Sequence, residues 1–199
     1  MTCIVGLAQD NTVWIGGDSA VTYGEGVVRH PEGKVFALGG FLLGCAGHLR
    51  GAEIVRHAFD PPPITGPDLD RYMHTAFVGA LRRLFREHGF LSYIQGQERT
   101  ETTVLVGVRG RLYGVSSNFN VYADTHPWLA LGDGAPHALG ALYATARLPL
   151  YPEARLRLAL EAAACYSKTV RPPFTVLRSP ACAPAEDCPS LAHGLHTPQ

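Results

Sequence analysis

The sequence predicts an α+β domain in which two antiparallel sheets pack face to face between two outer layers of helices, a four-layer αββα sandwich. Three observations predict this fold class. The chain has 199 residues, which is enough for one domain with a large core. Its apolar patterns follow the order strands, helices, strands, helices. Short polar or Gly-containing turns join neighbouring strands, which makes the pairing antiparallel.

The first predicted element is a hairpin. Strand-like runs at residues 3–8 and 12–17 flank a polar turn at residues 9–11. A turn centred on its middle residue would place Thr2 opposite Asp18 at the open end of the hairpin.

The second predicted hairpin follows a loop. It joins residues 34–38 to residues 41–45 around a Gly-Gly turn. Its pairing brings Lys34 beside Gly44 and Cys45. Both hairpins therefore open toward charged or Gly-rich ends.

The rest of the chain contains helices and further strands. Apolar residues recur at helical spacing in four segments, residues 48–58, 68–88, 136–147 and 152–168. Strand character returns in five segments, residues 102–108, 111–116, 121–123, 129–131 and 174–177. We assign residues 1–178 to the domain and the Pro- and Ala-rich residues 179–199 to a loosely held tail.

The composition excludes several classes of protein. Seventeen Lys and Arg residues balance seventeen Asp and Glu residues, so the chain offers no charged field for nucleic acid or an anionic membrane surface. The longest apolar run, residues 36–47, is shorter than the roughly 20 residues that a membrane-spanning helix needs. No cationic segment precedes residues 3–8, so we expect no secretory signal and a cytoplasmic protein.

Thr2 is the first candidate for chemistry. Threonine is small enough for the initiator Met1 to be removed, and an N-terminal Thr2 would carry both a hydroxyl and a free α-amine. The ordinary pKa of such an amine, about 7.7 to 8.0, suits a built-in base. Asp18 and Lys34 would supply a carboxylate and an ammonium group beside it. The backbone N–H of Gly44 is a candidate donor to a developing oxyanion.

These residues resemble the proteasome-type N-terminal-nucleophile (Ntn) hydrolases, including the bacterial two-component peptidase of HslV type. The resemblance covers about residues 2–170 and is closest to short proteasome-like proteins of actinobacteria and phages. It is carried by five segments: TCIVG at 2–6, GDSAVT at 17–22, KV at 34–35, GCAG at 44–47 and LGDG at 131–134.

The resemblance implies the Ntn-hydrolase fold and a threonine-type peptidase or amide hydrolase that needs no metal or other cofactor. The implied catalytic residues are Thr2, Asp18, Lys34 and Gly44. Thr22 would align the substrate backbone, and the primary pocket would be lined by Val21, Glu32, Phe36, Leu42 and Ala46. The resemblance also implies peptide or protein substrates, a homo-oligomeric ring and a possible ATP-dependent unfoldase partner.

Two positions depart from the family pattern, and we expect the residues there to support the catalytic residues. Asp133 replaces a serine, and Ser167 lies in a late-helix segment where many active proteasome subunits have an acidic residue. Asp133 also has a simpler interpretation as a helix N-cap, because a predicted helix begins just after it.

The sequence also allows three alternatives to the peptidase. A zinc site in the tail is disfavoured by the wide spacing of its four potential ligands, Cys182, Cys188, His193 and His196. Phosphate binding at residues 132–134 is disfavoured because the segment lacks a full dinucleotide fingerprint and a P-loop lysine. The third alternative is a non-catalytic assembly or phage-associated structural protein that reuses the scaffold. Mass spectrometry of the natural N-terminus distinguishes this alternative from the peptidase, because only the peptidase requires removal of Met1.

Overall fold

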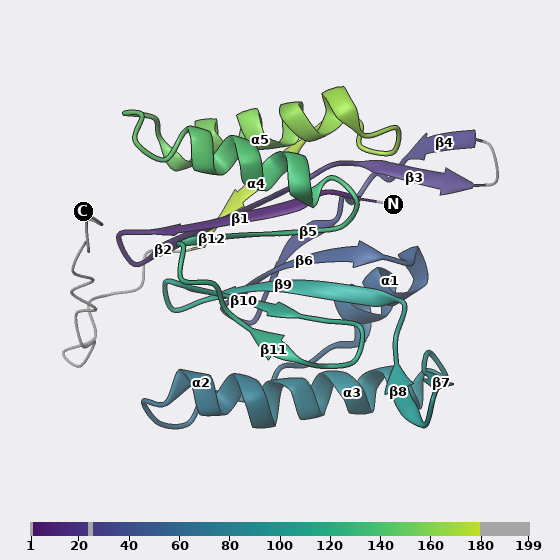
Figure 1. Ribbon diagram of the computed structural model, residues 1–199. Coiled ribbons are helices and arrows are strands. Elements are labelled where there is room, and N and C mark those ends of the chain that lie inside the picture. Colours follow the sequence, from purple (N-terminus) through teal and green to yellow (C-terminus); the bar gives the residue numbers. More distant parts are fainter. Residues whose placement is uncertain (1, 24–25, 180–199) are drawn as a thin grey trace.

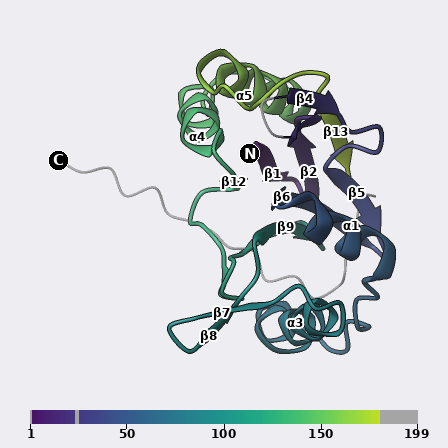
Figure 2. The ribbon, with the colours of Figure 1, turned by 90° about the vertical axis from the view of Figure 1, so that its right-hand side faces the viewer.

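The computed structural model describes residues 2–23 and 26–179, which form four layers (Figure 1). Two antiparallel sheets lie face to face at the centre, and helices cover the outer side of each. Figure 2, turned by a quarter turn, shows the same layers, with α4 and α5 on one outer side and α3 on the other. The predicted αββα fold class is therefore confirmed.

The first sheet holds both ends of the described chain. Its strands, in spatial order, are β12 (Trp128–Leu131), β1 (Ile4–Gln9), β2 (Thr12–Gly17) and β13 (Thr175–Arg178). The helices that cover it are α4 (Ala135–Ala144) and α5 (Pro152–Tyr166). Beyond β13, the Ser179 hydroxyl accepts a hydrogen bond from the Val13 N–H at 3.0 Å. The rest of the expected tail, including the four potential zinc ligands, lies outside the described residues.

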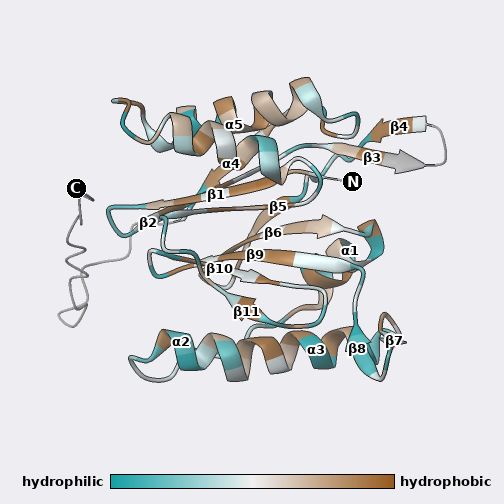
Figure 3. Cartoon of the chain, viewed as in Figure 1, coloured by the Kyte–Doolittle hydropathy of each residue, from teal (hydrophilic) through white to brown (hydrophobic). Residues whose placement is uncertain are grey.

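The second sheet has strands in the order β11 (Val121–Tyr122), β10 (Arg111–Val115), β9 (Thr102–Val108), β6 (Phe41–Gly47) and β5 (Val35–Leu38). Its helices are α1 (Leu49–Ala58) and the continuous series α2 (Leu69–Tyr72), η1 (Met73–Phe77) and α3 (Val78–Glu87), where η1 is π-helical. The helix expected over residues 68–88 is this series. Figure 3 shows hydrophilic residues along its outer side.

Three apolar cores hold the layers together. Phe77, Phe85 and Tyr113 belong to the core between the second sheet and its helices. Leu142 and Leu160 belong to the core between the first sheet and α4 and α5. The third core lies between the sheets and contains Ile4, Ile15, Leu42 and Leu105 among others. Burial of these side chains is the main favourable term in the free energy of folding.

The register of the first hairpin corrects the sequence prediction by one residue. Strand β1 pairs with β2 so that Ile4 lies opposite Gly17. Continued by one residue, this register places Cys3, and not Thr2, opposite Asp18. The reason is the turn: Asp10 and Asn11 have φ of 48° and 55°, which is a two-residue turn with two positive φ angles and not a three-residue loop.

The second hairpin forms as predicted. Val35 pairs with Gly44, and the N–H of Cys45 donates to the Lys34 carbonyl at 3.0 Å. Gly39 and Gly40 make the turn with φ of 54° and 85°, which favours glycine.

Two small hairpins were not predicted. Strands β3 (Ala20–Tyr23) and β4 (Gly26–Arg29) form a ribbon that projects beside the first sheet in Figure 1. Strands β7 (Ser92–Ile94) and β8 (Gln97–Arg99) form a second ribbon after α3. Their strands are only three or four residues long, so they lack the longer apolar runs used to predict the others. Within residues 2–23 and 26–179, no helix is long and apolar enough to cross a membrane.

Candidate active site

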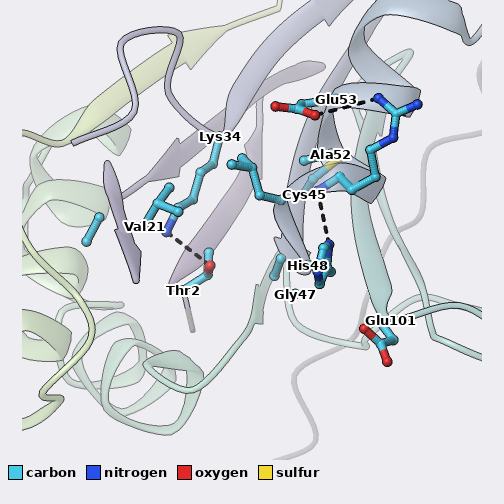
Figure 4. Close-up of a pocket in the computed structure, with 13 residues that line it drawn as sticks. Thr2, Val21, Lys34, Cys45, Gly47, His48, Ala52, Glu53 and Glu101 are labelled. Atoms are coloured by element: carbon cyan, nitrogen blue, oxygen red, sulfur yellow. Dashed lines mark hydrogen bonds and ion pairs between the residues drawn. The ribbon is translucent and has the colours of Figure 1, made fainter. Parts of the chain in front are cut away.

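Thr2, Lys34 and Asp18 form a buried chain of polar contacts. The Lys34 ammonium donates to the Thr2 hydroxyl at 3.0 Å and to the Asp18 carboxylate at 2.9 Å. Figure 4 shows the tip of Lys34 meeting the Thr2 hydroxyl. The exposed fraction is only 3% for Thr2, 7% for Lys34 and 1% for Asp18. Three residues distant in the sequence thus share one site.

The end of β2 holds Asp18 in place. Its carboxylate accepts hydrogen bonds from the backbone N–H groups of Cys3 at 3.0 Å and Ala20 at 3.1 Å, besides the bond from Lys34. The one-residue shift in register explains this arrangement, because Asp18 lies opposite Cys3 and reaches its N–H. A carboxylate with three donors is fixed in position and in turn fixes the lysine.

Burial lowers the pKa of Lys34 from its ordinary value, and the Asp18 carboxylate partly offsets this effect. Asp133 raises the pKa of Lys34 as well. An ammonium of lowered pKa that donates to a hydroxyl favours the deprotonated form of that hydroxyl. The site can therefore make Thr2 Oγ more nucleophilic.

Gly44 does not donate its N–H toward Thr2. The N–H of Cys45 donates to the carbonyl of Lys34, the residue before β5. The alternation along an antiparallel strand therefore directs the N–H of Gly44 to the other side, toward its partner Leu105 in β9. A Cβ at Gly44 would lie 2.5 Å from a methyl group of Ile4, inside the core between the sheets. The prediction of Gly44 as an oxyanion donor is therefore wrong.

Gly47 has the geometry that was expected of Gly44. Gly47 lies two residues after Cys45 in β6, so its N–H points to the same side as that of Cys45, toward β5. The pairing between β5 and β6 ends near Lys34 and Cys45, so β5 supplies no strand partner opposite Gly47. Gly47 lines cavities beside Thr2, and its φ of 111° suits glycine alone. The sequence contained this signal in the second glycine of the GCAG segment.

The loop at residues 132–134 packs against the backbone of Thr2. The N–H of Gly134 donates to the Thr2 carbonyl at 3.3 Å, and a Cβ at Gly132 would lie 2.2 Å from the same oxygen. The N-cap of α4 is Gly134, without a side-chain hydrogen bond, so the simpler interpretation of Asp133 as the cap is wrong. Asp133 is exposed at the edge of the site.

A cavity of about 580 Å³ opens beside Thr2 and Lys34 (Figure 4). Val21 and Ala46, both predicted pocket residues, line it. Of Thr22, the structure describes the backbone in β3 but not the side chain.

Three other predicted pocket residues lie elsewhere. Phe36 is buried in the core under the second sheet, where the Arg56 guanidinium stacks over its ring at 4.2 Å. Leu42 is buried between the sheets, and Glu32 pairs with Arg56 at 3.5 Å. Neighbouring strand positions point to opposite faces, so a pocket assignment fails when the face is not known.

Several cavity residues were missed by the sequence prediction. Cys45, His48, Arg50 and Glu53 line the cavity, and Arg50 and Glu53 approach each other at 3.7 Å. The helical segment that begins at His48 was predicted, but its orientation toward Thr2 was not.

Ser167, predicted as a supporting residue, caps the C-terminal end of α5, where its hydroxyl lies 3.0 Å from the hydroxyl of Thr169. The hydrogen bonds of Ser167 thus support the end of α5 and not Thr2.

The two buried cysteines near the site are poor nucleophiles. Burial raises the pKa of the Cys3 and Cys45 thiols to about 12, so both stay protonated near neutral pH. Among the described residues, no group of three or more His, Cys, Asp or Glu side chains is arranged to hold a metal ion.

Comparison with known proteins identifies the fold. No protein-family model matches the chain, and no curated protein matches it. A structure of Thiobacillus denitrificans BPH in complex with epoxomicin is similar with a TM-score of 0.76 and 23% identity, over 92% of this chain and 100% of that one. Eukaryotic HslV from Trypanosoma brucei is similar with a TM-score of 0.64 and 20% identity, over 89% and 98% of the two chains.

A third solved structure, the helical assembly of the Anbu complex from Pseudomonas aeruginosa, has a TM-score of 0.61 and 18% identity over 89% of this chain and 80% of that one. At these identities the likeness shows the fold. The chain has the proteasome-like Ntn-hydrolase fold of HslV type, as the resemblance implied.

Proposed function

We propose that this proteasome-like fold serves a threonine-type peptidase or amide hydrolase, with Thr2 as the nucleophile after Met1 is removed. The observation that carries the proposal is the buried contact of the Thr2 hydroxyl with Lys34, which Asp18 holds at 2.9 Å. A buried ammonium aimed at a hydroxyl is costly unless it is paired, and this one is paired in a way that activates threonine.

The reaction begins with attack of Thr2 Oγ on a substrate carbonyl carbon. The hydroxyl proton passes to the free α-amine of Thr2, directly or through a water, and the carbonyl electrons move onto the oxygen. We assign the stabilisation of that oxyanion to the backbone N–H of Gly47. The C–N bond then breaks, the leaving amine takes the proton, and an ester on Thr2 remains. Water hydrolyses the ester and returns the proton to Oγ.

The test is covalent labelling. The related BPH fold has been solved in complex with epoxomicin. We expect an epoxyketone of this kind to add one equivalent to the wild-type protein and none to Thr2→Ala, with the adduct on residue 2 by peptide mapping. Cys45→Ala is the matched control and should label like wild type. Labelling that persists in Thr2→Ala would contradict the assignment.

Processing is tested separately by intact mass. We expect the native protein to begin at Thr2, because the base exists only when Met1 is gone. A native protein with Met1 fully retained would favour the non-catalytic assembly or structural role over hydrolysis.

We further propose that the chain forms a homo-oligomeric ring, to which an ATP-dependent unfoldase can deliver protein substrates. Helix α4 contains no Asp, Glu, Lys or Arg, and two of its apolar side chains are exposed, Leu139 at 37% and Tyr143 at 72%. An apolar exposed face of this kind is typical of a surface covered by another subunit. Light scattering after size exclusion should give a mass that is a multiple of 21.4 kDa, and Tyr143→Glu should reduce that mass.

A further inference from the structure

A second cavity, of about 530 Å³, lies on the other side of Thr2. It shares Thr2, Ala46, Gly47 and Glu101 with the first cavity and is otherwise bounded in part by the β7–β8 hairpin. A peptide bond held at Thr2 Oγ would therefore have one flanking segment in each cavity. Val21, a predicted specificity residue, lines the first cavity and not the second, so the second would receive the leaving-group side.

The second cavity contains an arginine without an acidic partner. Arg99 lines it and is half-buried, and its Nε atom is buried without a hydrogen-bond partner. Within the described residues, no carboxylate lies within salt-bridge distance of this guanidinium. Thr100, which is 4% exposed and lines the same cavity, also has a hydroxyl oxygen without a partner. Buried polar groups almost always have hydrogen-bond partners, so the Arg99 guanidinium and the Thr100 hydroxyl are candidate contacts for a ligand in this cavity.

The neighbouring glutamate is already occupied. Glu98 accepts hydrogen bonds from Arg82, from Arg86 at 2.8 and 3.0 Å and from the Tyr93 hydroxyl at 2.8 Å. Because side chains alternate along a strand, Glu98 faces α3 while Arg99 faces the opposite side of β8, toward the cavity. Glu98 thus anchors the hairpin to α3, and Arg99 faces the cavity.

Two carboxylates also line the cavity, those of Asp133 and Glu101. Asp133 follows Gly132, which packs on the Thr2 backbone, and its negative charge raises the pKa of Lys34. Glu101 lies on the far side of Gly47 and His48 from Thr2 in Figure 4. Neither neutralises Arg99 by direct contact.

We infer that the second cavity is a leaving-group subsite in which Arg99, assisted by Thr100, binds a carboxylate of the substrate. The inference rests on the proposed hydrolase function, because a peptide leaving group brings carboxylates and no other common anion. Guanidinium binds carboxylate with two parallel hydrogen bonds, and a hydroxyl can add a third. The carboxylate belongs either to an acidic side chain or to a free C-terminus.

The test compares three internally quenched peptides that differ only on the leaving-group side. One carries Glu with an amidated C-terminus, one Gln with an amidated C-terminus, and one Gln with a free C-terminus. We expect the wild-type kcat/KM to favour at least one carboxylate peptide over the Gln amide by about tenfold, as one charge-assisted contact provides. Which peptide is favoured identifies the source of the carboxylate.

Variants assign the preference to Arg99. Arg99→Gln should reduce the ratio to near one, and Arg99→Lys should retain part of it. Arg83→Gln, which removes an exposed cation on α3, should leave the ratio unchanged. A ratio near one in the wild type, or an equal ratio in wild type and Arg99→Gln, would overturn the inference.

A binding assay separates this inference from the proposed function. Thr2→Ala protein is titrated with the same three peptides carrying a fluorophore, and anisotropy gives their affinities. A carboxylate preference lost in Arg99→Gln would support the subsite even if no peptide is hydrolysed. Hydrolysis that depends on Thr2 but shows no carboxylate preference would leave the proposed function standing and reject the subsite.

Discussion

At the scale of single residues, the site depends on the shape of one cation. Of the seventeen cationic residues, fifteen are arginine, and Lys34 is one of two lysines. Its ammonium reaches Thr2 and Asp18 at 3.0 and 2.9 Å from within a buried environment. A compact ammonium on a slim stem fits between these groups, whereas a planar guanidinium is wider and fixed in geometry.

We therefore expect Lys34→Arg to keep the net charge but to lower peptide hydrolysis by about 10² or more. Lys168→Arg, at an exposed position, is the matched control and should change little. Activity on fluorogenic peptides is measured, and circular dichroism confirms folding. Equal activity in the two variants would reject a catalytic role for Lys34.

The pH dependence of hydrolysis follows from the same residue. Activity should rise as the α-amine of Thr2 loses its proton, near its ordinary pKa of about 7.7 to 8.0. It should fall again as Lys34 loses its proton, at a pH below the ordinary lysine value of 10.5, because burial lowers this pKa. A kcat/KM profile from pH 6 to 11 tests this, and a flat alkaline limb up to pH 11 would contradict it.

At the scale of elements, short hairpins define the walls of the site. The β7–β8 hairpin makes few apolar contacts, and its strands are exposed or half-buried. Its anchor is Glu98, whose pKa falls to about 2 because Arg82, Tyr93 and Arg86 donate to it. The ion-pair network therefore replaces a core as the force that positions Arg99.

We expect Glu98→Gln to increase hydrogen exchange across residues 92–99 at neutral pH, while Glu87→Gln, on the same helical layer, should not. In the wild type, the folded pKa of Glu98 lies below the ordinary value of 4.5. Its stabilisation is therefore present above about pH 4.5 and is lost as the pH falls toward 2. Exchange of this hairpin that is unchanged in Glu98→Gln would exclude the anchoring role.

At the scale of the whole molecule, glycines allow the two sheets to approach. A Cβ at Gly107 in β9 would lie 2.6 Å from a methyl group of Val13 in β2, across the core between the sheets. Valine is stiff at χ1, so the contact cannot be relieved by a side-chain rotation alone. Gly79 in α3 has the opposite environment, with no atom within 4 Å of a Cβ.

We expect Gly107→Ala to lower the free energy of unfolding by about 1–3 kcal/mol. Gly79→Ala should raise it by up to about 1 kcal/mol, because alanine is the better helix former. Chemical denaturation of both variants measures the difference. A Gly107→Ala protein as stable as the wild type would mean that the sheets separate at little cost.

Much of this protein was determined by its sequence. Periodicity and turn residues predicted the two large hairpins and the helices, because these features depend on neighbours a few residues apart. The order of strands and helices along the chain then predicted the four layers. The same local reasoning brought together Thr2, Asp18 and Lys34, although the hairpin register was one residue off.

Only the tertiary structure decided which groups face the cavities. Gly47 replaced Gly44 because strand pairing settles where an N–H points, and Phe36 proved to be a core residue because its face of the sheet meets helices. Asp133 lies at the edge of the site, and Arg99 lines a cavity with Thr2, from 97 residues away. Contacts between distant segments depend on how the layers pack, and local sequence patterns do not determine that packing.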